Sequence, residues 1–313
     1  MLEHTGTLMP DRHFGPTRLV RAAALSMPDR DVYLKLETEL PTGSFKVRGA
    51  VHSLSVNLAK GRIREVVAAS TGNHGAAVAY AGRLLGVAAT IFLPTNPNPV
   101  KAARIRDLGA RLVETGTDLN AAIDAAREHA RSRSDRFFLH DAEDPDIPAG
   151  TATIGREVVR QLPAVEAIYV PMGDTALIRG VASAVKQLRP SVRIIGVVAE
   201  QAPAYYLSWR KSAAVETDSA NTIADGLAVR RPLAPNVAAI VELVDDVELV
   251  SEQEMLAAIA QLHRYEHVTA EPAGAAATAA WLKRGDPYRT SVALVTGGNI
   301  APDVLERSEK LEV

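Results

Sequence analysis

The sequence predicts an α/β protein of two domains, each an open, mostly parallel and twisted sheet flanked by helices. Three observations favour this fold class. Short apolar runs alternate with helix-length amphipathic segments from residue 61, the alternation resumes after residue 165, and a polar, proline-containing stretch at 141–150 separates the two series. Strands that alternate with helices are typical of parallel sheets, because parallel neighbours need a long crossover connection.

Each apolar run is short enough for a buried strand, whereas the segments between the runs repeat apolar residues every three or four positions, as amphipathic helices do. In the first series we expect strands within 64–70, 89–94, 111–116 and 137–140, and helices within 75–86, 99–110 and 119–133. In the second series we expect strands within 166–173, 193–200 and 291–298, and helices within 175–188, 251–268 and 274–285. A further helix is expected to begin at Lys46.

The composition argues against several function classes. Lys and Arg number 35 against 37 Asp and Glu, so no basic field favours nucleic acid or an anionic membrane. The chain has no cysteine, which excludes thiolate metal sites and cysteine nucleophiles and fits a reducing compartment. Residues 1–13 are too polar for a signal peptide, and no run of about 18 apolar residues occurs. We expect a cytoplasmic protein whose partner is a small molecule.

Glycine-rich turns follow three of the expected strands, at 69–75, 170–180 and 295–300. In open parallel sheets, ligands bind beyond the carboxyl ends of the strands, where helix N-termini present N–H groups. Any strand-to-helix turn needs small residues, so one such turn alone is more often structural than functional.

A particular lysine makes these turns more informative. Lys46 stands in PTGSFKVRGA at 41–50, directly after a Thr-Gly-Ser-Phe turn. Most lysines are simply solvated, but a desolvated lysine amine can form a Schiff base with an aldehyde such as pyridoxal phosphate. That cofactor also needs a phosphate cup, a partner for its ring nitrogen and a group against its ring. The sequence offers a candidate for each.

The motifs also carry a family resemblance. Five motifs occur in the chain: PTGSFKVRGA, STGNHG, TIADGLAV (222–229), EPAGAAA (271–277) and TGGN. In their order and approximate spacing, they resemble the motifs of the pyridoxal-phosphate dependent serine/threonine dehydratase and serine racemase family. The resemblance implies a tryptophan-synthase-β-like fold (fold type II) with the cofactor in the cleft between two domains. It implies a large cofactor-binding domain, 1–60 and 146–313, a small mobile substrate domain, 61–145, and a homodimer.

The resemblance also assigns roles to matched positions. Lys46 is expected to hold the cofactor and to move the substrate's α-proton, with Phe45 against the ring, Asn73 at the ring 3-hydroxyl and Gly226 lining the site. Thr296 is expected to face the ring nitrogen, where a neutral hydroxyl favours elimination over transamination. The residues expected to bind the substrate are Ser70, Thr71, Gly72, Asn73 and His74, the last mainly through its backbone.

The expected phosphate cup departs from the family's usual run of glycines. Here the stretch is Gly173-Asp174-Thr175-Ala176. A carboxylate repels a phosphate dianion, so Asp174 is expected to turn outward, toward the substrate or as a cap of the following helix. The N–H groups of Gly173, Thr175 and Ala176 and the Thr175 hydroxyl are expected to bind the phosphate.

Three further departures bear on the reaction. Thr71 stands where the resembling racemases carry a serine that acts as the second acid or base, so racemisation remains an alternative. Glu200 lacks the second carboxylate that a divalent cation site needs, which predicts no metal. Because the sequence ends at Val313, we expect no regulatory domain, and we expect catabolic or specialised use rather than feedback-controlled biosynthesis.

Two alternatives of other classes remain. HRYEH places His263 and His267 in the pattern of inverted zinc peptidases, with both expected on one helix. A non-catalytic relic of the fold would explain the altered cup, although it gives no reason to keep Lys46, Asn73 and Thr296 together.

The favoured function is a pyridoxal-phosphate dependent dehydratase, or ammonia-lyase, that converts a β-hydroxy-α-amino acid to a 2-oxo acid and ammonia. Its substrate stays open among serine, threonine, 3-hydroxyaspartate, phenylserine and a hydroxylated diamino acid from compatible-solute breakdown.

Overall fold

A computed structural model describes residues 13–285 and 287–311, which form two compact units. Unit 1 comprises Lys46–Gly150 together with residues 13–15. Unit 2 comprises Pro16–Phe45 together with 151–311. The segment 61–145, expected to form the small domain, lies wholly within unit 1, which also contains the helix that begins at Lys46. The role of 61–145 in binding substrate stays a prediction.

Unit 1 contains a four-stranded sheet in which every pair of neighbours is parallel. Its strands, in spatial order, are β5 (Arg111–Glu114), β4 (Ala88–Leu93), β3 (Glu65–Ala69) and β6 (Arg136–Phe138). Both central strands are apolar and largely buried, as expected for strands that are covered on two faces.

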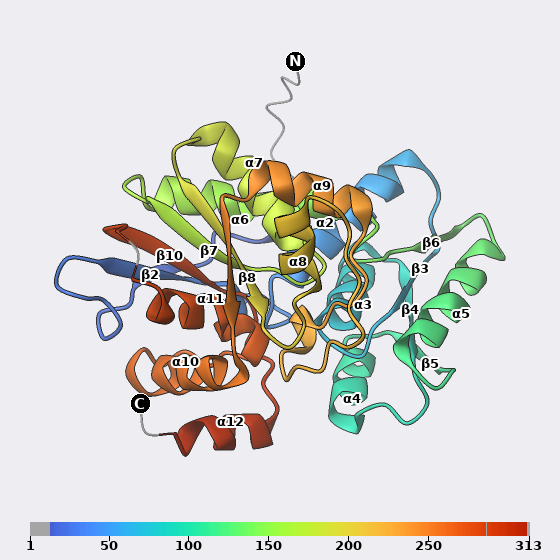
Figure 1. The fold of residues 1–313 in the computed structure, drawn as a ribbon. Helices are drawn as coiled ribbons and strands as arrows, with labels where there is room; N and C mark the ends of the chain where they lie inside the picture. The colour runs from blue at the N-terminus through green and yellow to red at the C-terminus, as the bar shows by residue number, and fades with distance from the viewer. Residues whose placement is uncertain (1–12, 286, 312–313) are drawn as a thin grey trace. The chain divides into compact units, whose positions relative to one another are not determined.

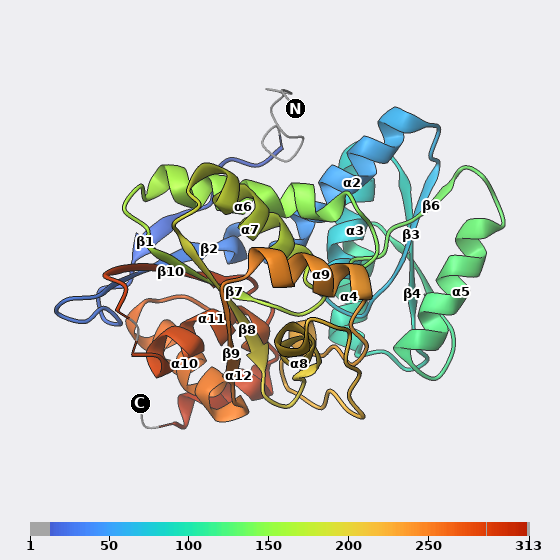
Figure 2. The same ribbon diagram turned by 45° about the horizontal axis from the view of Figure 1, so that its top comes forward.

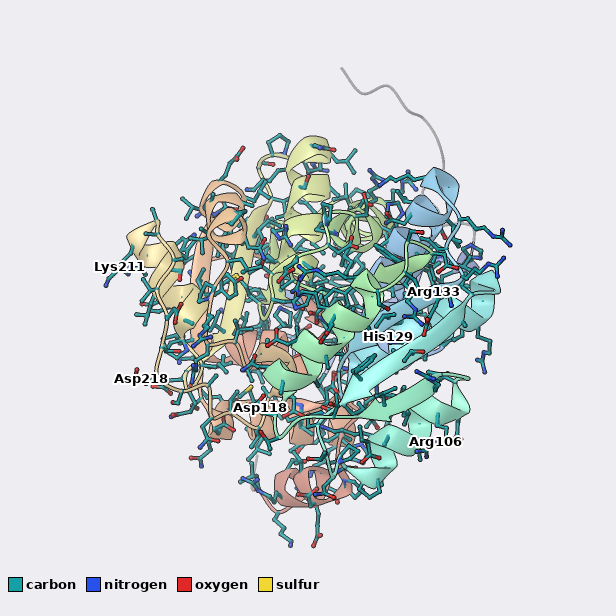
Figure 3. The ribbon with its side chains drawn as sticks, turned by 90° about the vertical axis from the view of Figure 1, so that its right-hand side faces the viewer. Arg106, Asp118, His129, Arg133, Lys211 and Asp218 are labelled. Atoms are coloured by element: carbon teal, nitrogen blue, oxygen red, sulfur yellow. The ribbon has the colours of Figure 1, made fainter. Side chains whose placement is uncertain are left out.

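Four helices of unit 1 accompany this sheet: α2 (Lys46–Lys60), α3 (Asn73–Leu85), α4 (Pro99–Asp107) and α5 (Leu119–Arg131). Figure 3 shows α5 lying over the sheet, with Asp118 at its N-terminal end and His129 near the other end. The Asp118 carboxylate caps α5 by accepting the N–H of Ala121 at 2.9 Å, which satisfies a donor that has no partner within the helix.

Unit 2 contains a six-stranded sheet in the order β1, β2, β10, β7, β8, β9. Only the β1–β2 pair is antiparallel among these described strands. The strands are β1 (Leu19–Arg21), β2 (Asp31–Leu36), β7 (Ala167–Pro171), β8 (Arg193–Ala199), β9 (Asp246–Val250) and β10 (Thr290–Val295). Since β7 and β10 are parallel neighbours, the turns that follow them emerge at the same edge of the sheet.

Helices cover both faces of the unit 2 sheet (Figures 1 and 2). One face carries α7 (Ala176–Leu188), α8 (Ala204–Lys211), α9 (Ala234–Leu243) and the later part of α6 (Ile147–Gln161). The other carries α10 (Glu252–Tyr265), α11 (Pro272–Lys283) and α12 (Pro302–Glu309). Two short 3₁₀ turns, η1 (Glu37–Glu39) and η2 (Asp225–Leu227), lie in the connections.

The predicted fold class is confirmed, and each expected strand and helix is present with ends shifted by a few residues. One local prediction is wrong. Helix α10 ends at Tyr265, and His267 has a left-handed φ of 55°, so His263 and His267 do not share a helix. In the part of the chain that the structure describes, no helix is both long and apolar enough to cross a bilayer.

Candidate active site

Lys46 is the first residue of α2, as predicted. Its side chain is 14% exposed, and its Nζ lies 3.1 Å from Oδ2 of Asp141, a residue of the same unit. A lysine amine that is largely withdrawn from water and held by a carboxylate differs from a solvated surface lysine. Asp141 was not anticipated from the sequence, because nothing in the polar stretch 141–150 marks one acidic residue above another.

The turn after β3 carries the predicted substrate-binding residues of unit 1. Ser70, Thr71, Gly72 and Asn73 are partly exposed, and Asn73 opens α3. The Gly72 N–H donates to Ser70 Oγ at 3.2 Å, which shapes the turn. A helix N-terminus of this kind presents N–H groups and a positive dipole end that suit a carboxylate.

His74 differs from the other residues of this turn because its side chain is buried. Its Nε2 lies 3.0 Å from the carbonyl oxygen of Leu139, so the ring donates inward rather than toward a ligand. Burial lowers the pKa of His74, and the nearby Lys46 charge lowers it further, against an opposing effect of Asp141. The His74 side chain is therefore neutral at pH 7 and bonds within the unit, and the expected role of its backbone stays a prediction.

In unit 2, a series of contacts connects four of the predicted cofactor residues at the carboxyl edge of the sheet. Thr296 directly follows β10, is 4% exposed, and its carbonyl accepts the N–H of Phe45 at 3.0 Å. The Thr296 hydroxyl approaches the Ala273 carbonyl at 3.5 Å, and Ala273 lies against Gly226. Gly226 in turn packs on Gly173, where an added Cβ would lie 2.0 Å from the Gly226 oxygen.

The cup itself is shaped by Asp174, whose Oδ1 accepts the N–H of Ala176 at 2.8 Å. Asp174 thus bonds the N–H of the first residue of α7, although the N-cap position itself belongs to Thr175, and it occupies an N–H that was expected to bind phosphate. Thr175 has φ of 73°, a strained value for a β-branched residue. Its hydroxyl accepts a hydrogen bond from Arg179 Nε at 3.2 Å and also bonds the buried Tyr205.

Arg179 bears on whether this cup can bind a phosphate. Its Nη2 is buried and has no hydrogen-bond partner within the described residues. Burial lowers the pKa of the guanidinium, with Asp174 and Tyr205 opposing this, yet an arginine stays charged at neutral pH. A charged donor without an acceptor, one turn into a helix whose N-terminus also favours anions, suits a phosphate group. Because Arg179 offsets the charge of Asp174, the cup is not net acidic, and its residues fit pyridoxal phosphate.

The predicted residues thus form two groups, one in each unit. Lys46, His74 and the 70–73 turn belong to unit 1, and the cup, Gly226, Phe45 and Thr296 belong to unit 2. Phe45 of unit 2 and Lys46 of unit 1 are consecutive in the sequence. The sequence indicated neither Asp141 nor Arg179, since a charged residue in a turn or on a helix carries no pattern of its own.

The zinc alternative gains no geometric support. His263 Nε2 lies 3.4 Å from Glu309 Oε1, and His267 stands beyond the end of α10. Within residues 13–285 and 287–311, no group of three or more His, Asp or Glu side chains is placed to hold a metal ion.

Comparison with known proteins identifies the family. Residues 11–297 match the model of the pyridoxal-phosphate dependent enzyme family. The chain belongs to this family. The pyridoxal-phosphate enzyme is 39% identical over 271 residues to an L-threonine ammonia-lyase of Geobacter sulfurreducens, which covers 86% of this chain and 67% of the relative.

Solved structures agree with this assignment. The processed form of threonine deaminase isoform 2 from Solanum lycopersicum superposes with a TM-score of 0.89 at 31% identity, covering 94% of this chain and 87% of that one. Maize serine racemase also gives a TM-score of 0.89, at 26% identity, with coverage of 96% and 93%. The predicted family, cofactor and enzyme class, a pyridoxal-phosphate dependent lyase, are confirmed.

Proposed function

We propose that this enzyme removes water and ammonia from a threonine- or serine-like β-hydroxy-α-amino acid and releases a 2-oxo acid. The observation that carries the proposal is the placement of Lys46 as a little-exposed amine at the start of α2. The names of the relatives support the same reaction, since they include L-threonine ammonia-lyases and a threonine deaminase.

We assign the following work to the chain's own residues. When bound, pyridoxal phosphate withdraws electrons from the substrate's α-carbon and makes the α-proton acidic. Lys46 attaches the cofactor through Nζ and, once displaced by the substrate amine, removes that proton as the base. The N–H groups at the start of α3 hold the substrate carboxylate, and Thr296 faces the ring nitrogen with a neutral hydroxyl. A hydroxyl cannot keep that nitrogen protonated, so departure of the β-hydroxyl is favoured over transamination.

We assign the cofactor phosphate to the start of α7, where Arg179 balances the carboxylate of Asp174. Arg179→Met should raise the dissociation constant of pyridoxal phosphate about tenfold, a loss of about 1.4 kcal/mol, because Asp174 then repels the phosphate without compensation. Equilibrium dialysis or fluorescence titration of the cofactor measures this effect.

Asp174→Asn serves as the matched partner in a double-mutant cycle. The doubly substituted protein should recover most of the lost affinity, since the repelling charge is gone. If Arg179→Met binds the cofactor as tightly as the wild type does, or if the second substitution restores nothing, the charge-balance assignment is wrong. Assaying Asp174→Asn on several substrates tests in the same protein whether its carboxylate also contributes to substrate preference.

Racemisation is the second candidate, and Thr71 together with the likeness to maize serine racemase favours including it. Thr71 is partly exposed in the turn that leads into α3 and carries the hydroxyl that a second acid or base needs. Ammonia release from a panel of β-hydroxy amino acids, with chirality followed in the same samples, tests both reactions. We expect ammonia and 2-oxo acid to form faster than the opposite enantiomer of the substrate. Formation of that enantiomer without ammonia release would show that the enzyme is a racemase rather than an ammonia-lyase.

We further propose that the enzyme is a cytoplasmic homodimer that acts on a small amino acid. The family resemblance supports the dimer, and a sequence without cysteine suits a reducing compartment. Light scattering of the purified, cofactor-loaded protein tests the dimer directly, with an expected mass of twice 33.4 kDa.

A further inference from the structure

The carboxylate of Asp141 has no role in the function proposed above, although it is a charged partner of Lys46. Asp141 follows shortly after β6, and its Oδ2 accepts a hydrogen bond from Lys46 Nζ at 3.1 Å. The side chains of Lys46 and Asp141 are 14% and 30% exposed, so water screens this pair less than it screens a surface ion pair.

The segment that carries Asp141 is fixed by backbone and side-chain hydrogen bonds. The Leu139 N–H donates to the Val67 carbonyl at 2.8 Å, and the Leu139 carbonyl accepts from His74. The next residue, His140, accepts the N–H groups of Ala142 and Glu143 on Nδ1 at 3.2 and 3.3 Å. Asp141 is therefore presented to Lys46 by an ordered turn.

Lys46 is the principal cation that Asp141 faces. Burial alone would raise the pKa of Asp141, but the charge of Lys46 and the hydrogen bond from its amine hold it well below its usual range. His74 is neutral at pH 7 because burial lowers its pKa. His140 Nδ1 accepts the N–H groups of Ala142 and Glu143, so it does not donate to the Asp141 carboxylate, which lies 3.9 Å away.

The other acids of this turn are engaged elsewhere. The Asp144 carboxylate accepts hydrogen bonds from the Ser53 hydroxyl at 2.9 Å and from the Asp146 N–H at 2.8 Å. Glu143 pairs with Arg127 at 3.0 Å, and Arg127 holds the pKa of Glu143 below its usual range, against an opposing effect of burial. Asp141 is therefore the carboxylate of this turn that stabilises the charged form of the Lys46 amine.

We propose that Asp141 is a positioning residue that holds Lys46 as an ammonium in the cofactor-free enzyme and so limits how fast the cofactor attaches at neutral pH. The inference rests on the proposed role of Lys46. The ion pair between Lys46 and Asp141 must break each time the enzyme takes up cofactor.

The chemistry of attachment explains why the ion pair must break. The ammonium of Lys46 first loses one proton to solvent, because the neutral amine is the nucleophile. The nitrogen lone pair then bonds to the aldehyde carbon of pyridoxal phosphate, and the aldehyde oxygen leaves as water with the two remaining amine hydrogens, which gives a carbon–nitrogen double bond. The ion pair opposes only the first of these steps, since it favours the charged nitrogen.

Asp141→Asn tests the proposal because asparagine keeps a hydrogen-bond acceptor and removes the charge. Loading of pyridoxal phosphate onto the cofactor-free variant, followed by absorbance, should be about tenfold faster at pH 7, because loss of the carboxylate charge favours the neutral amine. The two rates should converge at high pH, where the amine is neutral in both proteins. Asp146→Asn is the matched control, since Asp146 pairs at 3.0 Å with Lys60, the last residue of the same helix; its loading rate should equal the wild-type rate.

A second measurement needs no cofactor. Competitive acetylation with acetic anhydride, mapped by mass spectrometry, should show Lys46 reacting at lower pH in Asp141→Asn than in the wild type, with Lys60 as internal standard. A shifted acetylation curve, in a protein whose Lys46 does not attach the cofactor, would support the ion pair and contradict the proposed function. Superimposable curves in the two proteins would overturn the inference.

If Asp141→Asn does not fold, the wild type suffices. About 1 M salt should then raise the reactivity of Lys46 relative to that of free lysine added to the sample, because salt screens a partly exposed pair. If salt leaves the reactivity of Lys46 unchanged, the inference is wrong.

Discussion

Lys46→Ala should lower ammonia release by at least about 10⁴-fold and abolish the visible absorbance of the attached cofactor. Removal of a positioned base alone costs about 10²–10⁴-fold, and this substitution also removes the point of attachment. The fold should persist, because the partner carboxylate of Asp141 is 30% exposed and can be solvated once the amine is gone.

Lys60→Ala is the matched control for this prediction. Lys60 ends the same helix, pairs with Asp146 in the same manner, and is 61% exposed. Its loss should leave turnover and absorbance unchanged. Appreciable 2-oxo acid formation by a folded Lys46→Ala protein, as judged by circular dichroism, would show that another group performs the chemistry.

Gly173→Ala should weaken binding of pyridoxal phosphate about 100-fold. The added Cβ would lie 2.0 Å from the Gly226 oxygen, a distance that no pair of non-bonded heavy atoms tolerates, so the two turns must separate. A shift of about 1 Å in groups that position a reactant can cost about 10²-fold. Overpacking should also lower the free energy of unfolding by about 1–3 kcal/mol.

Gly285→Ala separates the local clash from a general effect of replacing glycine in unit 2. Among the described residues other than its chain neighbours, none has an atom within 4 Å of the added Cβ, so cofactor affinity and thermal stability should match the wild type. If Gly173→Ala binds pyridoxal phosphate as tightly as the wild type does, the contact between Gly173 and Gly226 does not shape the phosphate cup.

Much of the fold could be predicted because its strands and helices alternate with clear apolar periodicity. Strand β2 was not predicted, since Asp31 and Lys35 interrupt its apolar pattern. Lys35 is nevertheless fully buried and bonds Glu157 at 2.5 Å and the Thr17 carbonyl at 2.9 Å. A charge that is neutralised by a residue far along the chain cannot be recognised from local composition.

The candidate site also contains residues that could be predicted from the sequence and residues that could not. Lys46, Asn73 and Thr296 could be anticipated because each stands in a motif that the family resemblance covers. Asp141 and Arg179 could not, because their importance arises from what the fold places beside them: an amine for Asp141, and the turn of Asp174 and Thr175 for Arg179. The end of α10 before His267 likewise depends on a local left-handed residue that helical periodicity does not reveal.

Borohydride reduction of the cofactor-loaded enzyme, followed by proteolysis and mass mapping, tests the central claim most directly. Reduction makes the bond between the cofactor and its lysine permanent. We expect to find the reduced cofactor on the peptide containing Lys46, and we expect Lys60, at the other end of α2, to be unmodified. A Lys46 peptide recovered without the added mass from a fully loaded enzyme would contradict the claim.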